Sequence, residues 1–461
     1  MREPGPGELF FVPLGGSGEI GMNLNLYGHD GRWLMIDCGI TFEQDGGITH
    51  VLMPNVRFAH KRRKQLEGLV ITHAHEDHLG AVVHAWDKLR CPVYATPFAA
   101  AILRRKVAEA GGHTDLDDFD LRVVDRDAPL SLGPFTLRFI DVTHSTVESQ
   151  AILVSTPVGT VLHTGDFKLD PTPLVGAKTD FEALAEAAQG DIVAAVSDST
   201  NATKETSSRS EAELRDALVQ RLEAAKSGRV AVASFSSNIA RIDTLVKIAQ
   251  QLDRHPVVLG RSMHRMIGAA RACDYLPTWD TEIDMRDFGY LPPDKLMLIC
   301  TGTQGEPGSA MDRIARGDHR DITLERGDQV IFSSKIIPGN EDNIARLHGQ
   351  LRGRGVEVVS EKEGFVHVSG HPGRPELQRL YEVARPRAIV PVHGEQRHMT
   401  AHAELAESLG LPTMVPFNGA VVQLVPGPPT VLDTVEHGRL RVPGRDSGPR
   451  PRRDTSRRRR R

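Results

Sequence analysis

Residues 72–78 read Thr-His-Ala-His-Glu-Asp-His and stand between two elements of different periodicity. The apolar run at 66–71 predicts a buried strand before them, and apolar residues at helical spacing over 79–86 predict a helix after them. Three imidazoles and two carboxylates therefore lie on one strand-to-helix loop. Four candidate metal ligands within six residues at a strand end form a specific signal. A polar loop with chance histidines is the competing interpretation.

The backbone geometry of this loop suits two neighbouring metal ions. In an extended chain alternate side chains point to the same side, so His73 and His75 face together, whereas Asp77 and His78 follow the bend. We expect one metal at the first pair and another at the second pair. Neutral imidazole and carboxylate ligands without thiolate favour zinc, with manganese or iron as the alternatives.

The composition is that of an ordinary globular protein. Apolar residues make up 39% of the 461 residues and charged residues 25%, which allows two or three domains with large cores. The four scattered cysteines contain no C-x-x-C pair, which argues against a thiolate zinc site and indicates a reducing compartment. The sequence contains no apolar signal region and no run of about 18 apolar residues, so we predict a cytoplasmic protein without membrane contact.

The net charge of −4 hides an uneven distribution of charge. Residues 441–461 carry ten arginines and two aspartates, so the rest of the chain is acidic. A groove for a polyanion must then be a local feature of the surface. We expect residues 436–461 to form a disordered arginine-rich tail, which is either an incidental extension or an electrostatic contact for RNA.

Gly16, Gly18 and Gly21 match the G-x-G-x-x-G fingerprint of dinucleotide-binding proteins. That fingerprint requires a helix directly after the glycines. Here the next segment alternates at Leu24 and Leu26 and then reaches a turn, which predicts a hairpin. We therefore predict a tight loop between strands, and a nucleotide cofactor is the less favoured alternative.

Further candidate ligands follow other predicted strands. Asp37 ends a strand and could orient a metal-bound water or a ligand histidine, although a simple turn aspartate is an equal alternative. His144 follows a strand and could complete the first metal site. Asp166 follows a strand and a glycine, where a carboxylate can bridge two cations about 3.5–4 Å apart. Strands also end at Asp198 and His393, and strand ends are where α/β folds place their sites.

From about residue 207 strands and helices alternate in a parallel α/β pattern, which predicts a second domain. Three of its predicted strand ends carry small polar residues, at 234–238, 301–305 and 333–335. Hydroxyls and backbone N–H groups that open helices bind phosphate, although each alone is more often an ordinary helix cap. Together they indicate a groove for a polyanion.

The ordered set of ligand candidates resembles that of the metallo-β-lactamase superfamily. Asp198, His371 and His393 resemble the additional motifs of its nucleic-acid branch, the β-CASP nucleases. Longer runs over about residues 8–435 are similar to bacterial ribonuclease J. These runs are PLGGSGEIGMN (13–23), TGDFK (164–168), SDSTN (197–201), TGTQGE (301–306), IPGNE (337–341), HVSGH (367–371) and PVHGE (391–395).

The resemblance implies an α/β fold in which a parallel α/β β-CASP domain is inserted into a four-layer αββα metallo-β-lactamase domain. We expect the first part of the metallo-β-lactamase domain at 1–206, the β-CASP domain at 207–369, the completing segment at 370–435 and the tail at 436–461. The active site and an RNA channel would lie between the two domains. The family usually has a further C-terminal domain that assists dimerisation, and this chain turns to arginine-rich sequence near 440, which leaves a homodimer open.

The resemblance also implies roles for individual residues. One zinc ion would be bound by His73, His75, His144 and Asp166. The other would be bound by Asp77, His78, Asp166 and His393, with Asp37 behind the ligands. Asp77 would orient the attacking water, while His371, oriented by Asp198, would protonate the leaving group. The RNA 5′-phosphate would be bound by Ser236, Ser237, His367 and Ser369.

The implied activity is that of a ribonuclease with two Zn²⁺ ions per chain, or Mn²⁺, that hydrolyses RNA from the 5′ end, prefers a 5′-monophosphate and also cuts internally. Its partners would be RNA and the proteins of an RNA-degradation assembly. One alternative is a small-molecule hydrolase of the same superfamily, and another is a non-catalytic RNA-binding protein. The β-CASP-like insert argues against the first alternative and the complete set of ligands against the second.

Overall fold

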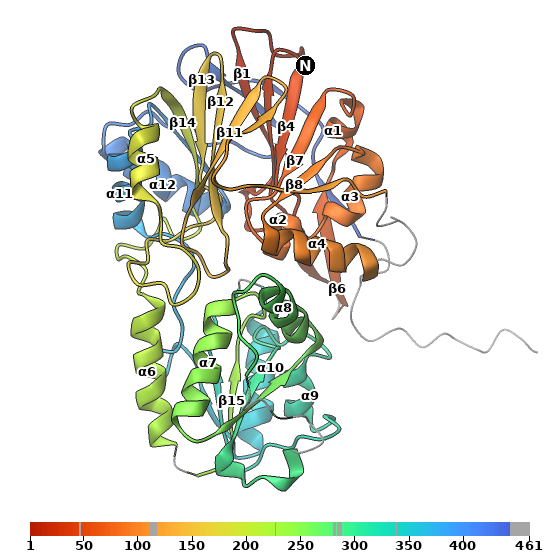
Figure 1. Cartoon of the computed structure of the whole chain (residues 1–461), viewed down its shortest axis with the longest axis vertical. Helices are drawn as coiled ribbons and strands as arrows, with labels where there is room; N and C mark the ends of the chain where they lie inside the picture. Colours follow the sequence, from red (N-terminus) through yellow and green to blue (C-terminus); the bar gives the residue numbers. More distant parts are fainter. Residues whose placement is uncertain are drawn as a thin grey trace, which may run out of the picture.

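The computed structural model describes residues 1–45, 48–109, 118–225, 227–279, 283, 288–337 and 339–442. In Figure 1 the chain forms an upper body from its red-to-yellow and blue parts, and a lower body from its green-to-cyan part. The upper body therefore contains segments from both ends of the described chain. None of the described helices is long and apolar enough to span a membrane.

The larger sheet of the upper body has eight strands. In spatial order they are β23 (Thr430–Thr434), β22 (Ala420–Val425), β1 (Leu9–Gly15), β3 (Leu24–His29), β4 (Arg32–Ile36), β7 (Leu66–Val70), β8 (Val93–Ala95) and β9 (Leu121–Val123). β1 and β3 pair antiparallel, so the glycine-rich stretch is a loop between strands, as predicted. Within this loop β2 (Ser17–Gly18) pairs with β21 (Gly394–Glu395).

The second sheet has six strands and faces the first. Its strands are β10 (Leu130–Leu132), β11 (Phe135–Asp141), β12 (Gln150–Thr156), β13 (Gly159–His163), β14 (Ile192–Asp198) and β20 (Ile389–Val392). Alternating apolar side chains such as Phe11, Leu34, Leu137 and Val154 meet in a dry core between the two sheets. The two sheets therefore pack as the inner layers of a sandwich.

Helices form the outer layers of the upper body (Figure 1). Packed on the eight-stranded sheet are α1 (Arg57–Lys61), α3 (Val82–Leu89) and α4 (Pro97–Glu109), while the short α2 (Glu76–Leu79) begins within the loop at 72–78. Packed on the six-stranded sheet are α5 (Phe181–Ala187), α11 (Arg374–Ala384) and α12 (Gln396–Ser408). The predicted four-layer αββα arrangement is confirmed.

The lower body is built on an all-parallel sheet, which confirms the predicted α/β pattern after residue 207. Its strands are β16 (His255–Leu259), β17 (Leu296–Cys300), β15 (Val230–Ala233), β18 (Gln329–Phe332) and β19 (Glu357–Val359). One face carries α6 (Glu211–Ala224), α7 (Ile239–Gln251) and α8 (Arg261–Ala272), and the other carries α9 (Ala310–Arg316) and α10 (Glu341–Gly353). Two short 3₁₀ turns, η1 (Phe288–Tyr290) and η2 (Pro293–Lys295), precede β17.

The C-terminal part of the chain returns to the upper body. β20 completes the six-stranded sheet beside β14, and β22 pairs with β1 in the eight-stranded sheet. A small third sheet contains β5 (Thr41–Asp45), β6 (Ile48–Pro54) and β24 (Arg439–Arg441). β24 lies inside the predicted disordered tail, so that prediction is wrong at its start, because strand pairing with β6 orders residues 439–441. Residues 443–461 of the predicted tail lie outside the described residues.

Candidate active site

The predicted ligands come from loops that follow strand ends of both sheets of the upper body. His73 and His75 follow β7, His144 follows β11, Asp166 follows β13, and His393 follows β20. Because β13, β14 and β20 run parallel, their carboxyl ends meet at one edge of the six-stranded sheet. The structure thus gathers at one place residues that are up to 320 positions apart in sequence.

The first group of converging side chains is His73, His75, His144 and Asp166. The Nδ1 atom of His75 lies 3.1 Å from Nε2 of His73 and 3.0 Å from Nε2 of His144. The Oδ2 atom of Asp166 lies 3.8 Å from each of these Nε2 atoms. In a tetrahedral zinc site with bonds of about 2.0–2.1 Å, the ligand atoms are about 3.3 Å apart, so this spacing is that of ligands to one cation.

The second group contains Asp77, His78, Asp166 and His393. Nε2 of His78 lies 3.2 Å from Oδ2 of Asp166, and Nε2 of His393 lies 3.2 Å from Oδ2 of Asp77 and 3.6 Å from Oδ2 of Asp166. Asp166 therefore belongs to both groups through the same oxygen. This is the arrangement that one carboxylate makes when it bridges two cations.

The chemistry of the donors fits bound divalent cations. Oδ1 of Asp166 is buried and has no hydrogen-bond partner among the described residues, and a buried carboxylate oxygen normally has one. Burial holds the pKa of His73 and His144 well below the usual range and lowers the pKa of His75 to about 4. Neutral imidazoles keep their lone pairs available for a cation. Burial opposes ionisation of Asp166, yet His393 and His78 hold its pKa well below the usual value.

Asp37 lies behind the second group. Its Oδ2 lies 2.7 Å from Nδ1 of His78, and its Oδ1 accepts a hydrogen bond of 2.8 Å from the backbone N–H of Thr72. Burial lowers the pKa of His78, but Asp166, Asp37 and Asp77 outweigh it and raise that pKa well above its usual value. Asp37 has a positive φ of 62°, which its contacts at the loop of 72–78 hold in place.

The turn after Asp37 approaches the loop of 72–78 so closely that only glycine fits at position 39. A Cβ atom on Gly39 would lie 1.7 Å from the carbonyl oxygen of Asp77. The backbone also joins the two segments, since the N–H of Cys38 donates to the carbonyl oxygen of His78 at 2.6 Å. The glycine therefore allows the close contact that places Asp37 against His78.

Asp198 and His371 form a hydrogen-bonded pair beside the predicted metal ligands. Nδ1 of His371 lies 2.8 Å from Oδ2 of Asp198. Burial lowers the pKa of His371, but the charges of Asp198, Asp166 and Asp77 outweigh it and raise that pKa to about 9. The hydrogen bond and the charge of Asp198 therefore favour the protonated imidazole, which can donate a proton to a bound group.

The four residues predicted to bind phosphate lie on two loops of the chain. Ser369 lies close to the site, because its Oγ accepts a hydrogen bond of 2.7 Å from Nδ2 of Asn201 and another of 3.2 Å from the N–H of His371. Nδ1 of His367 is buried and has no partner among the described residues. Ser236 and Ser237 lie between β15 and α7, and in the described part of the chain no hydrogen bond joins them to His367 or Ser369.

Sequence reasoning missed several residues that contact the ligands. Nδ2 of Asn23 donates to the carbonyl oxygen of Asp77 at 3.1 Å and lies 3.1 Å from Nε2 of His78. Oγ1 of Thr200 lies 3.1 Å from Nδ1 of His393, which fixes the orientation of that ring. Both residues belong to the runs PLGGSGEIGMN and SDSTN, so membership of those runs was the signal that could have identified them.

His402 is a further missed residue, and it supports the strand end that carries Asp198. Its side chain is fully buried, with Nδ1 2.9 Å from Oγ of Ser199 and Nε2 in a short contact with the hydroxyl of Tyr381. Burial lowers the pKa of His402 to about 4. The ring is therefore neutral in the folded protein, and no local sequence pattern indicated this role.

The buried neutral state of His402 predicts a pH dependence of stability. The unfolded chain takes up a proton at this histidine below about pH 6.5, whereas the folded chain does so only near pH 4, so stability is lost as the pH falls through this window. The unfolding free energy of the wild type relative to His402→Gln should fall by about 2 kcal/mol between pH 7 and pH 5. Chemical denaturation at both pH values measures it, and an equal difference at both would contradict the prediction.

Three segments of the chain match models of known protein families. Residues 22–219 match the model of the metallo-β-lactamase superfamily, residues 227–351 the model of the ribonuclease J β-CASP domain, and residues 355–416 the model of the Zn-dependent metallo-hydrolase RNA specificity domain. Ribonuclease J of Sinorhizobium meliloti is 41% identical over 441 residues, which cover 94% of this chain and 77% of the relative. The chain belongs to the ribonuclease J family. It is therefore a metal-dependent ribonuclease, and its match to RNA-specific models argues against the small-molecule alternative.

Two further comparisons agree with membership of the ribonuclease J family. Ribonuclease J of Mycolicibacterium smegmatis is 40% identical over 450 residues, which cover 96% of this chain and 79% of the relative. A crystal structure of a protein of unknown function from Enterococcus faecalis has a TM-score of 0.61 and 15% identity, and the match covers 90% of this chain and 100% of that protein. At that identity the second likeness concerns the fold alone.

Proposed function

We propose that this ribonuclease binds two Zn²⁺ ions and hydrolyses RNA in the 5′-to-3′ direction, with a preference for a 5′-monophosphate and with internal cleavage as a second mode. The observation that carries the proposal is the sharing of Asp166 by two groups of ligands beside the Asp198–His371 pair. A cytoplasmic location, partners from an RNA-degradation assembly and a homodimer stay predictions. Manganese is the alternative metal.

In this proposal His73, His75, His144 and Asp166 hold one cation, and Asp77, His78, Asp166 and His393 hold the other. When bound, such cations activate water and stabilise negative charge on a phosphate. Asp37 keeps His78 oriented through its 2.7 Å contact with Nδ1, which leaves Nε2 directed at Asp166. The ligands are therefore held in place by the protein before a cation arrives.

Residues in and beside the ligand groups orient the attacking water and protonate the leaving group. Oδ2 of Asp77 points into the second group and can accept a hydrogen bond from the attacking water, which orients it. His371 gives a proton to the departing 3′-oxygen, while Asp198 holds the ring through the 2.8 Å contact and stabilises its protonated form. The products are then a 3′-hydroxyl on one fragment and a 5′-phosphate on the other.

The proposed 5′-end pocket consists of Ser236, Ser237, His367 and Ser369. Its support is the unpartnered buried Nδ1 of His367 and the position of Ser369, two residues before His371. A pocket so close to the proton donor would place the first phosphodiester of the RNA at the ligands. That placement gives stepwise release of mononucleotides, whereas a strand that bypasses the pocket is cut internally.

We also propose domain limits of 1–206, 207–369 and 370–435. The support is the sheet topology, because all strands of the parallel five-stranded sheet lie between 230 and 359, whereas β20 and β22 pair with strands of the first segment. The four residues of the proposed 5′-end pocket then all lie in the inserted domain, whereas the predicted metal ligands lie in the first and third segments.

A single RNA sequence carrying a 5′-monophosphate, a 5′-triphosphate or a 5′-hydroxyl tests the proposed activity. With zinc- or manganese-loaded protein, mononucleotide release from the monophosphate should exceed that from the hydroxyl by at least about tenfold, since charge-assisted hydrogen bonds to the phosphate are lost with the hydroxyl. His367→Ala should reduce this preference, and His75→Ala should abolish cleavage of all three. Internal cuts that are indifferent to the 5′ end would overturn the exonuclease assignment.

A further inference from the structure

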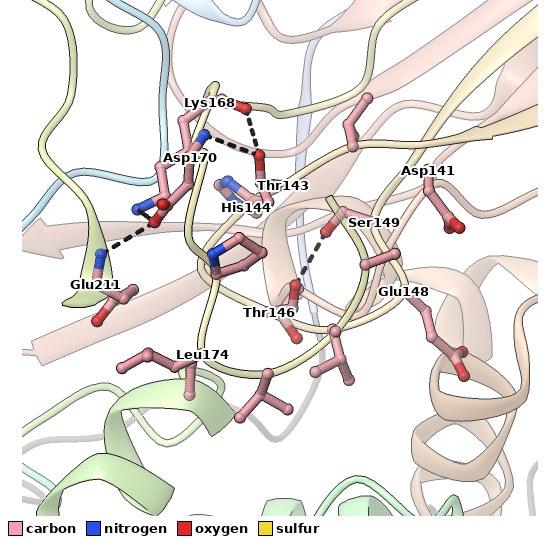
Figure 2. A pocket seen from close by; sticks show the side chains of 17 residues that line it. Asp141, Thr143, His144, Thr146, Glu148, Ser149, Lys168, Asp170, Leu174 and Glu211 are labelled. Atoms are coloured by element: carbon pink, nitrogen blue, oxygen red, sulfur yellow. Dashed lines mark hydrogen bonds and ion pairs between the residues drawn. The ribbon is translucent and has the colours of Figure 1, made fainter. Parts of the chain in front are cut away.

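A chain of buried charged side chains joins the loop of Asp166 to the inserted domain. Lys168 and Asp170 follow Asp166 closely in sequence, and both are almost fully buried. Nζ of Lys168 lies 3.0 Å from Oδ2 of Asp170, and the same oxygen accepts a hydrogen bond of 3.0 Å from the backbone N–H of Glu211 (Figure 2). Glu211 is the first residue of α6 in the inserted domain, so Asp170 contacts both bodies.

Glu211 continues this chain through a buried ion pair with Arg241 of α7. The exposed fraction of Arg241 is 0%, and its Nε and Nη2 atoms donate to the two carboxylate oxygens of Glu211 at 3.1 and 3.0 Å. Its remaining group, Nη1, donates to the carbonyl oxygen of Ser333 at 3.3 Å and to the Ser333 hydroxyl. That hydroxyl donates to the carbonyl oxygen of Val366 at 2.6 Å. Val366 immediately precedes His367 of the 5′-end pocket.

The geometry of this ion pair matters more than its contribution to stability. Removing two charges from water offsets most of the attraction between them, so a buried pair stabilises a fold little. A planar guanidinium, in contrast, donates in several fixed directions at once. Arg241 uses these directions to hold Glu211 and Ser333 in one arrangement.

Positively charged side chains, including Arg241 and Lys168, also act electrostatically on His367 of the 5′-end pocket. Burial first, and then the positive charges of Arg241, Lys335 and Lys168, hold the pKa of His367 well below its usual value, while the backbone of Ser333 acts in the opposite direction. Arg241 therefore lies close enough for its positive charge to lower the pKa of His367. A positive field at that place also favours a phosphate anion.

We propose that Arg241 is a positioning residue that holds the 5′-end pocket at a set distance from the metal ligands. The inference rests on the proposed function, which assigns the pocket. Through Ser333 the guanidinium fixes the backbone that carries the pocket, and through Glu211 it is tied to the loop of Asp166. RNA seated in the pocket then presents its first phosphodiester at the same position in every turnover.

Arg241→Lys and Ser333→Ala test this inference from two directions. Lysine keeps the charge but cannot donate to Glu211 and Ser333 together, and alanine keeps the ion pair but removes the link to Val366. Arg254→Lys is the matched control. Arg254 is also buried in the inserted domain, but it donates to the carbonyl oxygens of residues 225, 228 and 296, at the ends of β15 and β17 opposite to Ser333.

Two ratios are measured for each protein. The first is the ratio of affinities for 5′-monophosphate and 5′-hydroxyl RNA in EDTA, where no hydrolysis occurs, and the second is the ratio of kcat/KM values with metal. Both ratios should fall about tenfold in Arg241→Lys and Ser333→Ala, because the pocket is displaced, and should keep their wild-type values in Arg254→Lys. A general loss of stability would lower the rates on both RNAs alike and leave the ratios unchanged.

Wild-type ratios in a folded Arg241→Lys and in Ser333→Ala would overturn the proposal, as would an equal fall in Arg254→Lys. If Arg241→Lys does not fold, Ser333→Ala decides alone, because it leaves the ion pair intact. A wild-type protein with no preference for the 5′-monophosphate would instead overturn the 5′-end pocket, and the positioning role with it.

Discussion

Asp166→Asn is expected to reduce RNA hydrolysis by at least about a thousandfold and to remove most of the bound metal. Oδ2 of Asp166 lies between 3.2 and 3.8 Å from ring nitrogens of four histidines, His73, His78, His144 and His393. Asparagine has the same shape but lacks the charge that a bridge between two cations requires. Metal content after dialysis and the rate of RNA hydrolysis measure the two effects.

Asp141→Asn is the matched control for this substitution. Asp141 ends β11, lies three residues before His144 and pairs with Arg126 at 2.7 Å instead of facing the ligands. The control should keep its metal and its activity. An Asp166→Asn protein that retains two metals per chain would show that this carboxylate does not bridge them, and the proposed ligand sets would then be wrong.

His371→Gln is expected to slow hydrolysis of ordinary RNA by about 10²- to 10⁴-fold, the range over which positioned acids act. The reason is that the 3′-oxygen would depart without a proton. RNA in which sulfur replaces that 3′-oxygen provides the diagnostic measurement, because a thiolate leaves readily without protonation. On the sulfur substrate the difference between variant and wild type should largely disappear.

The metal content of the variant distinguishes a proton-donor role of His371 from a role as a metal ligand. His371 also converges with Asp166, Asp198 and His393 in a group that could hold a cation. Under the proton-donor role His371→Gln keeps its full metal content, whereas a ligand role predicts loss of metal together with a defect on both substrates. An undiminished defect on the sulfur substrate would rule out protonation of the 3′-oxygen by His371.

Local sequence patterns predicted the parts of the site that short segments determine. The period of the side chains around His73 and His75 placed both on one side of a strand end, and the alternation at Leu24 and Leu26 distinguished a hairpin from a nucleotide-binding turn. The position of Asp166 after a strand and a glycine already suggested a bridging carboxylate. The full ligand sets came from the family resemblance, because no short segment contains both His78 and His393, which lie near Asp166 only in the fold.

Long-range pairing explains most of what the sequence did not reveal. β24 has three residues and pairs with β6, which lies far away in the chain, so neither length nor periodicity marks it as a strand. Likewise, β9 has only three residues and lies in a polar stretch, so its sequence does not mark it as a strand. Asn23 and His402 act through tertiary contacts with His78 and Ser199, which no local spacing predicts.

The position of β20 in the six-stranded sheet sets the order in which the enzyme becomes competent during synthesis. His393 follows β20, and β22, which completes the core between the two sheets, comes later still. Domains fold as units while the chain leaves the ribosome, so the inserted domain can form while the two sheets of its host still lack β20, β22 and β23. A nascent chain that has not yet added β20 therefore carries six of the seven predicted metal ligands but not a finished site.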